Sequence, residues 1–119
     1  MRFSFRNPGR PRSAILIALM HNAAMTVTLH VLVAGQVQGV GYRDGLCAQA
    51  LRHGVCGWVR NRRDRTVEAI LQGEAAAVET VLAWARRGPA AARVTDVTTR
   101  PATGELNRPY QGFDSLPSA

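Results

Sequence analysis

A chain of 119 residues has room for one folded domain, because dividing it would leave two cores too small to bury enough surface. Its 46% hydrophobic and 19% charged residues lie in the ordinary globular range, which excludes wholesale disorder. The formal charge of +7 suggests an anionic partner, but four of the 15 basic residues, all of them arginines, precede residue 25; from there on 11 arginines face 8 acids, a net charge of only +3.

Residues 1–24 form a basic, partly apolar segment ahead of the first strand pattern. The segment superficially resembles a targeting signal, but Asn22 spoils the small-residue pattern expected before a cleavage point. Its apolar run, 14–20, is too short to span a bilayer. We interpret residues 1–24 as a disordered extension or a misassigned start, with a targeting segment as the alternative. The folded domain is predicted to span residues 25–119.

The first predicted elements are a strand and a helix on either side of a glycine-rich stretch. Apolar and polar residues alternate over 26–34, which indicates a half-buried strand. The glycine-rich stretch 35–41 follows. Apolar residues then recur at helical spacing over 42–53, and Gly54 is a suitable left-handed terminator.

The second half of the chain predicts a hairpin, a helix and further strands. Residues 55–61 and 66–73 read as two strands joined by a tight polar link. The stretch 74–89 predicts an amphipathic helix with a Gly-Pro stop, and 93–99 predicts a strand, with a short fifth strand at 110–116. The resulting β-α-β-β-α-β order favours an α+β fold, in which one antiparallel sheet carries both helices on a single face.

The cysteines are too few for a disulfide framework. Cys47 and Cys56 are therefore expected to be reduced packing thiols in a cytoplasmic protein. A zinc site built from these two and His53 would lack a fourth ligand and a usual spacing, so no metal site is predicted.

The glycine-rich stretch is the strongest candidate for a binding site. Gly35, Gly39 and Gly41 lie between a strand and a helix start, where unpaired backbone N–H groups and the positive end of the helix dipole converge. A P-loop would end in Gly-Lys-Ser/Thr, but Tyr42 and Arg43 follow here, and the dinucleotide-binding pattern also fails. A tight turn is the simplest use of such glycines. Arg43 favours an anion site, because a cation in the first turn opposes the dipole unless a dianion is bound.

Two stretches resemble the signatures of the acylphosphatase family. "GQVQGVGYR", residues 35–43, is similar to the first signature of that family, and "GWVRNRRDRTVE", residues 57–68, to the second. The similarity extends over about Met25 to Phe113 and includes "ARVTDV" and "YQGF". The resemblance implies a ferredoxin-like βαββαβ sandwich and an enzyme that hydrolyses acyl phosphates, which are carboxylic–phosphoric mixed anhydrides, to carboxylate and phosphate.

The resemblance also implies roles for individual residues, by matching motif positions. Arg43 would be the phosphate-binding arginine, and Asn61 would position the attacking water. The remaining phosphate-binding residues, which would contribute backbone amides to a cradle, are Gln38, Gly39, Val40, Gly41 and Tyr42.

Hydrolysis of an acyl phosphate requires few further catalytic groups, because the bond between phosphorus and the acyl oxygen is already activated. An amide suits the water-positioning role, since it both donates and accepts hydrogen bonds without changing charge. We therefore expect a metal-independent hydrolase without a cofactor. Its partner would be a small-molecule acyl phosphate, with no membrane and no nucleic acid, and the protein is expected to be a monomer.

Several of these residues also have simpler interpretations. Asn61 alone would be a turn-former at the end of a hairpin. Tyr42 and Trp58 are expected to be packing aromatics. His30 and Glu68, on the polar strand faces, are expected to be solvated, and no carboxylate that would orient His30 as a base is evident in its motif.

The second signature departs from the family pattern at one position. Arg65 follows Asp64 where the family usually has glycine, so we expect either a different turn or a backbone strain of about 1 kcal/mol. Asn61 precedes the turn and is expected to keep its place. Gln36 stands where arginine is common, which weakens long-range attraction of anions without touching the cradle.

Two other functions remain open at this point. A nucleic-acid-binding module would explain four arginines in the hairpin, at positions 60, 62, 63 and 65, but the exposed aromatic motif of RNA-binding sheets is missing from the sequence. A catalytically silent phosphate-binding module is the other alternative, since motifs alone do not distinguish it from an enzyme.

Overall fold

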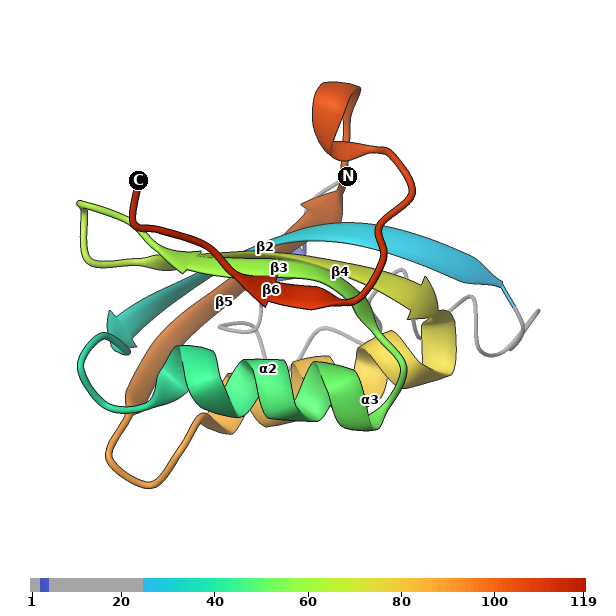
Figure 1. The fold of residues 1–119 in the computed structure, drawn as a ribbon. Helices are drawn as coiled ribbons and strands as arrows, with labels where there is room; N and C mark the ends of the chain where they lie inside the picture. Colours follow the sequence, from blue (N-terminus) through green and yellow to red (C-terminus); the bar gives the residue numbers. More distant parts are fainter. Residues whose placement is uncertain (1–2, 5–24) are drawn as a thin grey trace.

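The computed structural model describes residues 3–4 and 25–119 of the chain as a single sheet with both helices on one face (Figure 1). The two described residues of the predicted extension, Phe3–Ser4, form strand β1, which pairs antiparallel with Thr98 and Thr99. The rest of the segment 1–24 lies outside the described residues, and so does the prediction made for it.

The other elements follow the predicted order. They are β2 (Thr26–Gln36), α2 (Tyr42–Arg52), β3 (Cys56–Asn61), β4 (Val67–Glu74), α3 (Ala75–Arg87), β5 (Arg93–Pro101), the 3-10 helix η1 (Gly104–Leu106) and β6 (Phe113–Ser115). The predicted ferredoxin-like α+β fold is confirmed. Gly54 has φ 68°, the left-handed conformation expected where α2 ends.

The strands are arranged in the order β1-β5-β2-β4-β3-β6. The four long strands pair antiparallel, as predicted. The short last strand, β6, instead pairs parallel with β3, and Phe113 lies opposite Gly57. The sheet is therefore mixed, because the chain after β5 crosses to the far edge and enters it near the start of β3.

The topology brings the two signature loops to the same end of the sheet. Both β2 and β3 are antiparallel to β4, which lies between them, so they run in the same direction. Gln36 and Asn61 end these two strands. The loop 37–41 and the hairpin turn 62–66 consequently lie at one end of the molecule, on the left in Figure 1.

The main core lies between the sheet and the helices. Side chains that alternate along the strands meet the apolar faces of α2 and α3. Gly45 lets the two helices approach closely, because a Cβ atom there would lie 2.4 Å from the Trp84 ring. The fully buried members with the largest side chains are Tyr42, Leu46, Ile70, Leu71, Leu82, Val31, Val33, Val37, Val55, Val59 and Val67, of which Ile70 faces the other side of the sheet.

The C-terminal segment covers part of the opposite, open face of the sheet (Figure 1). A second apolar cluster there consists of Trp58, Ile70 and Ala102, with Leu106, Tyr110 and Leu116 packed against it. Gln72 fastens the segment, since its Nε2 donates to Arg108 O at 2.8 Å and its Oε1 accepts from the Tyr110 N–H at 2.8 Å. The predictions that Tyr42 and Trp58 are packing aromatics are confirmed.

Candidate active site

The loop between β2 and α2 owes its shape to two glycines. Gly39 and Gly41 have φ values of 74° and 80°, in the left-handed region that side chains disfavour. A Cβ atom at either position would meet nothing within 4 Å, so the dihedral angle rather than lack of space requires glycine. Gly41 is also the residue before the first turn of α2, and its lack of a side chain leaves that turn without a side-chain cap.

The backbone donors of this loop are free. Within the described ranges, 3–4 and 25–119, no backbone N–H of residues 38–43 donates a hydrogen bond. The first hydrogen bond of the helix is donated by the N–H of Gly45 to Gly41 O, at 3.1 Å. Unpaired donors therefore gather at the positive end of the helix dipole, an arrangement that suits an anion.

Gly35 has a different structural role from the other two glycines. The sequence pattern predicts that it belongs to the turn with Gly39 and Gly41, but the structure places it inside β2, at a β-bulge between Ala34 and Gly35. Its φ is 123°, and a Cβ atom would lie 2.0 Å from Arg93 O. Glycine is therefore required at position 35 because β5 approaches closely there, and not because of the cradle.

Arg43 follows the loop in the first turn of α2 and is partly exposed. Its side chain forms no ion pair or hydrogen bond with any residue in the part of the chain that the structure describes. It is close enough to influence Cys47, one turn further along: burial raises the pKa of that thiol, Asp44 raises it further, and Arg43 opposes both. The first turn of α2 therefore carries a cation that has no counterion among the described residues, close in sequence to the unpaired amides.

Tyr42 fixes the start of α2 to the neighbouring helix. Its hydroxyl donates to Ala85 O at 2.8 Å, and its ring lies 5.4 Å from that of Trp84. Burial raises the pKa of Tyr42 well above its ordinary value. The side chain therefore stays neutral and anchors the loop, while its backbone N–H faces outward from the helix start.

Asn61 ends β3, opposite Val67 of β4. Its side-chain oxygen, Oδ1, is buried and has no hydrogen-bond partner within the described residues. The backbone around it is held by the C-terminal segment, because the N–H of Ala119 donates to Asn61 O at 3.0 Å and the N–H of Arg63 donates to Ala119 O at 2.9 Å. Buried acceptors are usually hydrogen-bonded, so an unpaired one at this end of the sheet indicates a site where a ligand or water binds.

The hairpin after Asn61 carries the strain expected from its sequence. Arg65 has φ 77°, and it is the single non-glycine residue with positive φ among residues 3–4 and 25–119. The Arg65 N–H donates to Arg62 O at 3.1 Å, and the Arg62 N–H donates to Thr66 O at 2.8 Å. Asp64 Oδ1 accepts from both the backbone N–H and the hydroxyl of Thr66. The turn keeps the shape that glycine would favour, and arginine adopts it.

The side chain of Gln38 makes contacts that the sequence does not predict. Its Nε2 donates to Arg62 O at 2.8 Å and to Thr66 O at 2.9 Å. These bonds tie the loop 37–41 to the hairpin that follows Asn61. A glutamine in a loop gives no sequence signal for such a long-range contact, so only the fold reveals it.

The expectation that His30 and Glu68 are solvated is wrong. The two residues are 6% and 4% exposed, and His30 Nε2 lies 2.6 Å from Glu68 Oε2. Arg60 Nε donates to Glu68 Oε1 at 2.7 Å, and Arg62 Nη1 lies 3.4 Å from the same oxygen. Arg100 Nε donates to His30 Nδ1 at 3.2 Å. Both side chains are buried because they pair across strands and because neighbouring arginines cover them. The alternation of residues within one strand does not predict such contacts.

The charges around Glu68 set its protonation. Burial by itself would raise the pKa of this carboxyl group, but hydrogen bonds from His30 and Arg60, together with their charges, lower it below its usual value. Glu68 is therefore an ionised acceptor at the centre of the network, and a role as proton donor does not fit.

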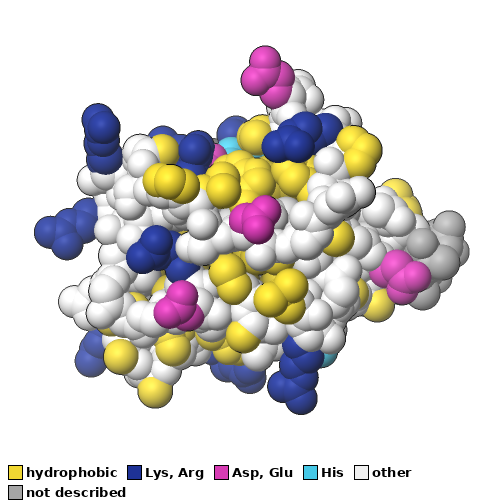
Figure 2. All heavy atoms as spheres, viewed as in Figure 1, with side chains coloured by type: hydrophobic (Ala, Val, Ile, Leu, Met, Phe, Trp, Pro, Cys, Tyr) yellow, Lys and Arg dark blue, Asp and Glu magenta, His cyan; other side chains and the backbone are white. Residues whose placement is uncertain are grey.

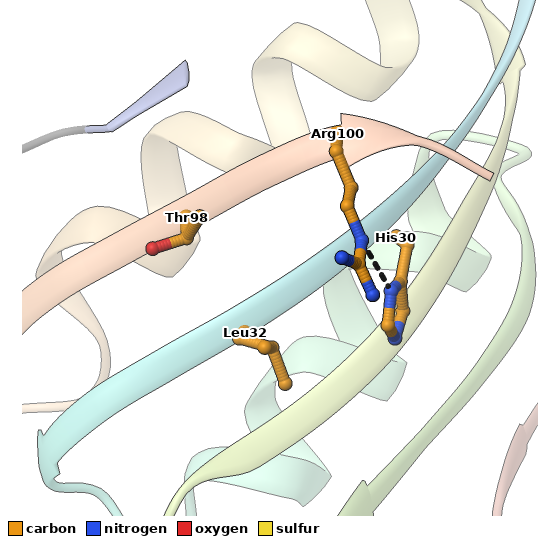
Figure 3. Close-up of a pocket in the computed structure, with 4 residues that line it drawn as sticks. All are labelled: His30, Leu32, Thr98 and Arg100. Carbon is orange, nitrogen blue, oxygen red and sulfur yellow. Dashed lines mark hydrogen bonds between the residues drawn. The ribbon is translucent and has the colours of Figure 1, made fainter. Parts of the chain in front are cut away.

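A small hollow lies on the open face beside this network. Figure 3 shows its lining of His30, Leu32, Thr98 and Arg100, with Arg100 reaching across to the His30 ring. These residues belong to the middle of β2 and to the last part of β5. The hollow is therefore separate from the loop 37–41 and from Asn61.

The nucleic-acid alternative loses its main support. Two of the four hairpin arginines, Arg60 and Arg62, are engaged with Glu68, and Arg60 also lies over the Trp58 ring, 4.9 Å from its centroid. Trp58 is covered and offers no stacking platform. On the face seen in Figure 2, basic side chains are scattered and form no continuous patch.

Neither a metal cluster nor a membrane span is found where the structure is described. In residues 3–4 and 25–119, no three His, Cys, Asp or Glu side chains are grouped to hold a metal ion. No helix in that part of the chain is long and apolar enough to cross a membrane. Metal independence, a monomeric state and a cytoplasmic location stay predictions.

Comparison with known proteins agrees with the geometry. The sequence profile of the acylphosphatase family matches residues 29–115. The chain belongs to the acylphosphatase family. An acylphosphatase of Rhodopseudomonas palustris (strain BisB18) is 46% identical over 96 residues, which cover 78% of this chain and 97% of the relative. One of Methylococcus capsulatus (strain ATCC 33009 / NCIMB 11132 / Bath) is 52% identical over 80 residues, covering 66% and 87%.

Solved acylphosphatases share the fold. A structure of an acylphosphatase from Coxiella burnetii has a TM-score of 0.70 and 30% sequence identity, and the match covers 76% of this chain and 93% of that one. The prediction of an acylphosphatase enzyme is confirmed, and its reaction is the hydrolysis of acyl phosphates.

Proposed function

We propose that this acylphosphatase holds the phosphoryl group of its substrate in the cradle formed by the backbone amides of residues 38–43 and the guanidinium of Arg43. The observation that carries this proposal is the set of unpaired N–H groups at the start of α2, in the same turn as Arg43, whose side chain forms no ion pair with any described residue. Amides and the helix dipole favour a dianion, and the planar guanidinium binds two of its oxygens at once.

Water attacks the phosphorus atom directly in the proposed reaction. The bond from the water oxygen to phosphorus forms, the bond from phosphorus to the acyl oxygen breaks, and the carboxylate leaves with the electron pair. The proton of the water passes to a phosphoryl oxygen, so no separate base is needed. The cradle accelerates this step because its donors are already oriented toward the charge that develops on the phosphoryl oxygens.

Asn61 positions the water in this proposal. Its Oδ1 has no hydrogen-bond partner within the described residues, so its capacity to accept a hydrogen bond is unused. Asn61 and the loop 37–41 lie at the same end of the sheet because β2 and β3 run in the same direction. A fixed water removes much of the entropic cost of bringing the nucleophile to phosphorus.

The test is hydrolysis of benzoyl phosphate by the full chain in water enriched in oxygen-18, with and without chelator. We expect the heavy oxygen in the released phosphate, no effect of chelator, and competitive inhibition by inorganic phosphate. Heavy oxygen in the benzoate would overturn attack at phosphorus. Non-competitive inhibition by phosphate would overturn the cradle as the substrate site, and loss of activity with chelator would overturn metal independence.

A further inference from the structure

Gln38 serves the site with its side chain as well as with its backbone. Its backbone N–H is one of the free donors of the loop, whereas its Nε2 donates two hydrogen bonds, at 2.8 Å to Arg62 O and at 2.9 Å to Thr66 O. One –NH₂ group has two hydrogens, so both donors of the amide are used. The partly buried side chain therefore joins the loop to the hairpin.

The two accepting carbonyls lie at the neck of the hairpin. Arg62 follows Asn61 directly, and Thr66 precedes Val67, the residue opposite Asn61. The neck is closed by the Arg62 N–H, which donates to Thr66 O at 2.8 Å. Gln38 thus holds both strands of the hairpin at the level of Asn61.

The side chain of Asn61 has little else to fix its place. Its Oδ1 has no partner within the described residues, so no hydrogen bond of that atom orients it. Its position relative to the cradle then depends on the backbone of the hairpin, which is held by the pairing of β3 with β4, by Gln38 on one side and by Ala119 on the other.

We propose that the side-chain amide of Gln38 is a positioning residue that sets the distance between Asn61 and the phosphate cradle. This inference rests on the proposed function and deepens it. Gln38 touches neither substrate nor water with this group. It acts through Asn61, and its loss displaces the hairpin while the backbone donors of the loop persist.

Substitutions at position 38 separate this role from phosphate binding. Gln38→Met keeps the length of the side chain and removes both donors, and Gln38→Glu places a carboxylate against two carbonyl oxygens. We expect kcat on benzoyl phosphate to fall at least about tenfold in either variant, since displacement of a reacting group by about 1 Å costs up to about 10²-fold. The inhibition constant of inorganic phosphate should stay within about threefold, because the cradle amides persist. Gln111→Met, at an exposed glutamine, is the matched control and should keep the wild-type kcat.

A double-mutant cycle shows whether Gln38 works through Asn61. In the Asn61→Ala background, Gln38→Met should lower kcat by no more than about twofold, because the group that it positions is already gone. A full and additive loss in that background would overturn the proposal, since it would mean a role independent of Asn61.

An NMR measurement decides the inference without reference to turnover. The side-chain amide resonance of Asn61 should shift in both Gln38 variants and stay in place in Gln111→Met. An unchanged Asn61 resonance in either folded Gln38 variant overturns the positioning role, whether or not the wild-type chain hydrolyses benzoyl phosphate. If the wild-type chain does not hydrolyse benzoyl phosphate but the Asn61 resonance shifts in the Gln38 variants, the proposed function is overturned. The contact between the loop and the hairpin is then still supported.

Discussion

His30 Nε2 and Glu68 Oε2 lie 2.6 Å apart on the face of the sheet opposite the helices. His30 is in register with Ile70 on the neighbouring strand, so Glu68 is its diagonal neighbour, within reach of a side chain of this length. Arg100 donates to the other ring nitrogen. The imidazole ring is therefore held from both sides, by the guanidinium of Arg100 at Nδ1 and by the carboxylate of Glu68 at Nε2.

Glu68→Gln should destabilise the protein by about 3 kcal/mol at neutral pH, because it removes the charge of a buried carboxylate that Arg60, Arg62 and His30 share. Denaturant unfolding of wild type and variant measures this difference. Glu105→Gln, at an exposed position, is the control and should change the free energy of unfolding by less than about 0.5 kcal/mol.

The same network makes stability depend on pH. The pKa of Glu68 is lower in the folded protein than in the unfolded chain, so its ionised form stabilises the fold above the ordinary carboxyl value of about 4.3. That stabilisation is lost as the pH falls through the folded pKa. The difference between wild type and Glu68→Gln should therefore shrink below about pH 4. A difference that stays constant down to pH 3 would contradict the lowered pKa.

Asn61→Ala should lower kcat by about 10²-fold or more, if Asn61 orients the water. The inhibition constant of inorganic phosphate should change little, because Asn61 is not part of the cradle. Steady-state kinetics with benzoyl phosphate and phosphate inhibition measure both quantities. Asn107→Ala, at an exposed asparagine outside the site, should behave as wild type. Full activity of Asn61→Ala would remove the residue from the mechanism.

Arg43→Ala should weaken phosphate binding by about 2–4 kcal/mol, or roughly 30- to 1,000-fold, because it removes a charge-assisted two-point contact. Calorimetric titration with inorganic phosphate measures the loss. Arg52→Ala, at an exposed arginine in the last turn of the same helix, also lowers the net charge by one and should leave the affinity within about twofold. Equal losses in both variants would indicate a general charge effect and would contradict a direct contact.

Arg65→Gly should raise the free energy of unfolding by about 0.5–1 kcal/mol. The left-handed conformation of Arg65 costs about 1–2 kcal/mol, and the greater freedom of glycine in the unfolded chain offsets part of the gain. The midpoint of thermal unfolding should rise by a few degrees. Arg63→Gly, in the same turn but without positive φ, should bring no gain. A destabilised Arg65→Gly would show that the side chain contributes more than its backbone costs.

The order of elements could be predicted because each depends on a local pattern. Alternation in β2 and β4, helical spacing in α3 and the glycine after α2 report which face of each segment is apolar. The candidate residues of the cradle and Asn61 could also be named from the sequence, because each signature is a continuous stretch of sequence. The shared direction of β2 and β3 then brings the two signatures together.

The missed features depend on contacts between distant parts of the chain. The burial of His30 and Glu68 requires Arg60 of β3, Arg62 of the following turn and Arg100 of β5 to converge. The bonds of Gln38 to the hairpin join residues 24 and 28 positions apart. The parallel pairing of β6 depends on where a long connection re-enters the sheet. Patterns within one segment contain no information on such pairings.

The hydrogen bonds between Ala119 and the hairpin also matter for how the enzyme is produced. Any purification tag fused after Ala119 would begin against the backbone of Asn61 and Arg63. The other end of β2, at Thr26, lies about 33 Å from the loop at 3.3 Å per residue. Kinetic constants measured with a tag after Ala119 would therefore combine the chemistry of the site with the disturbance that the added peptide introduces.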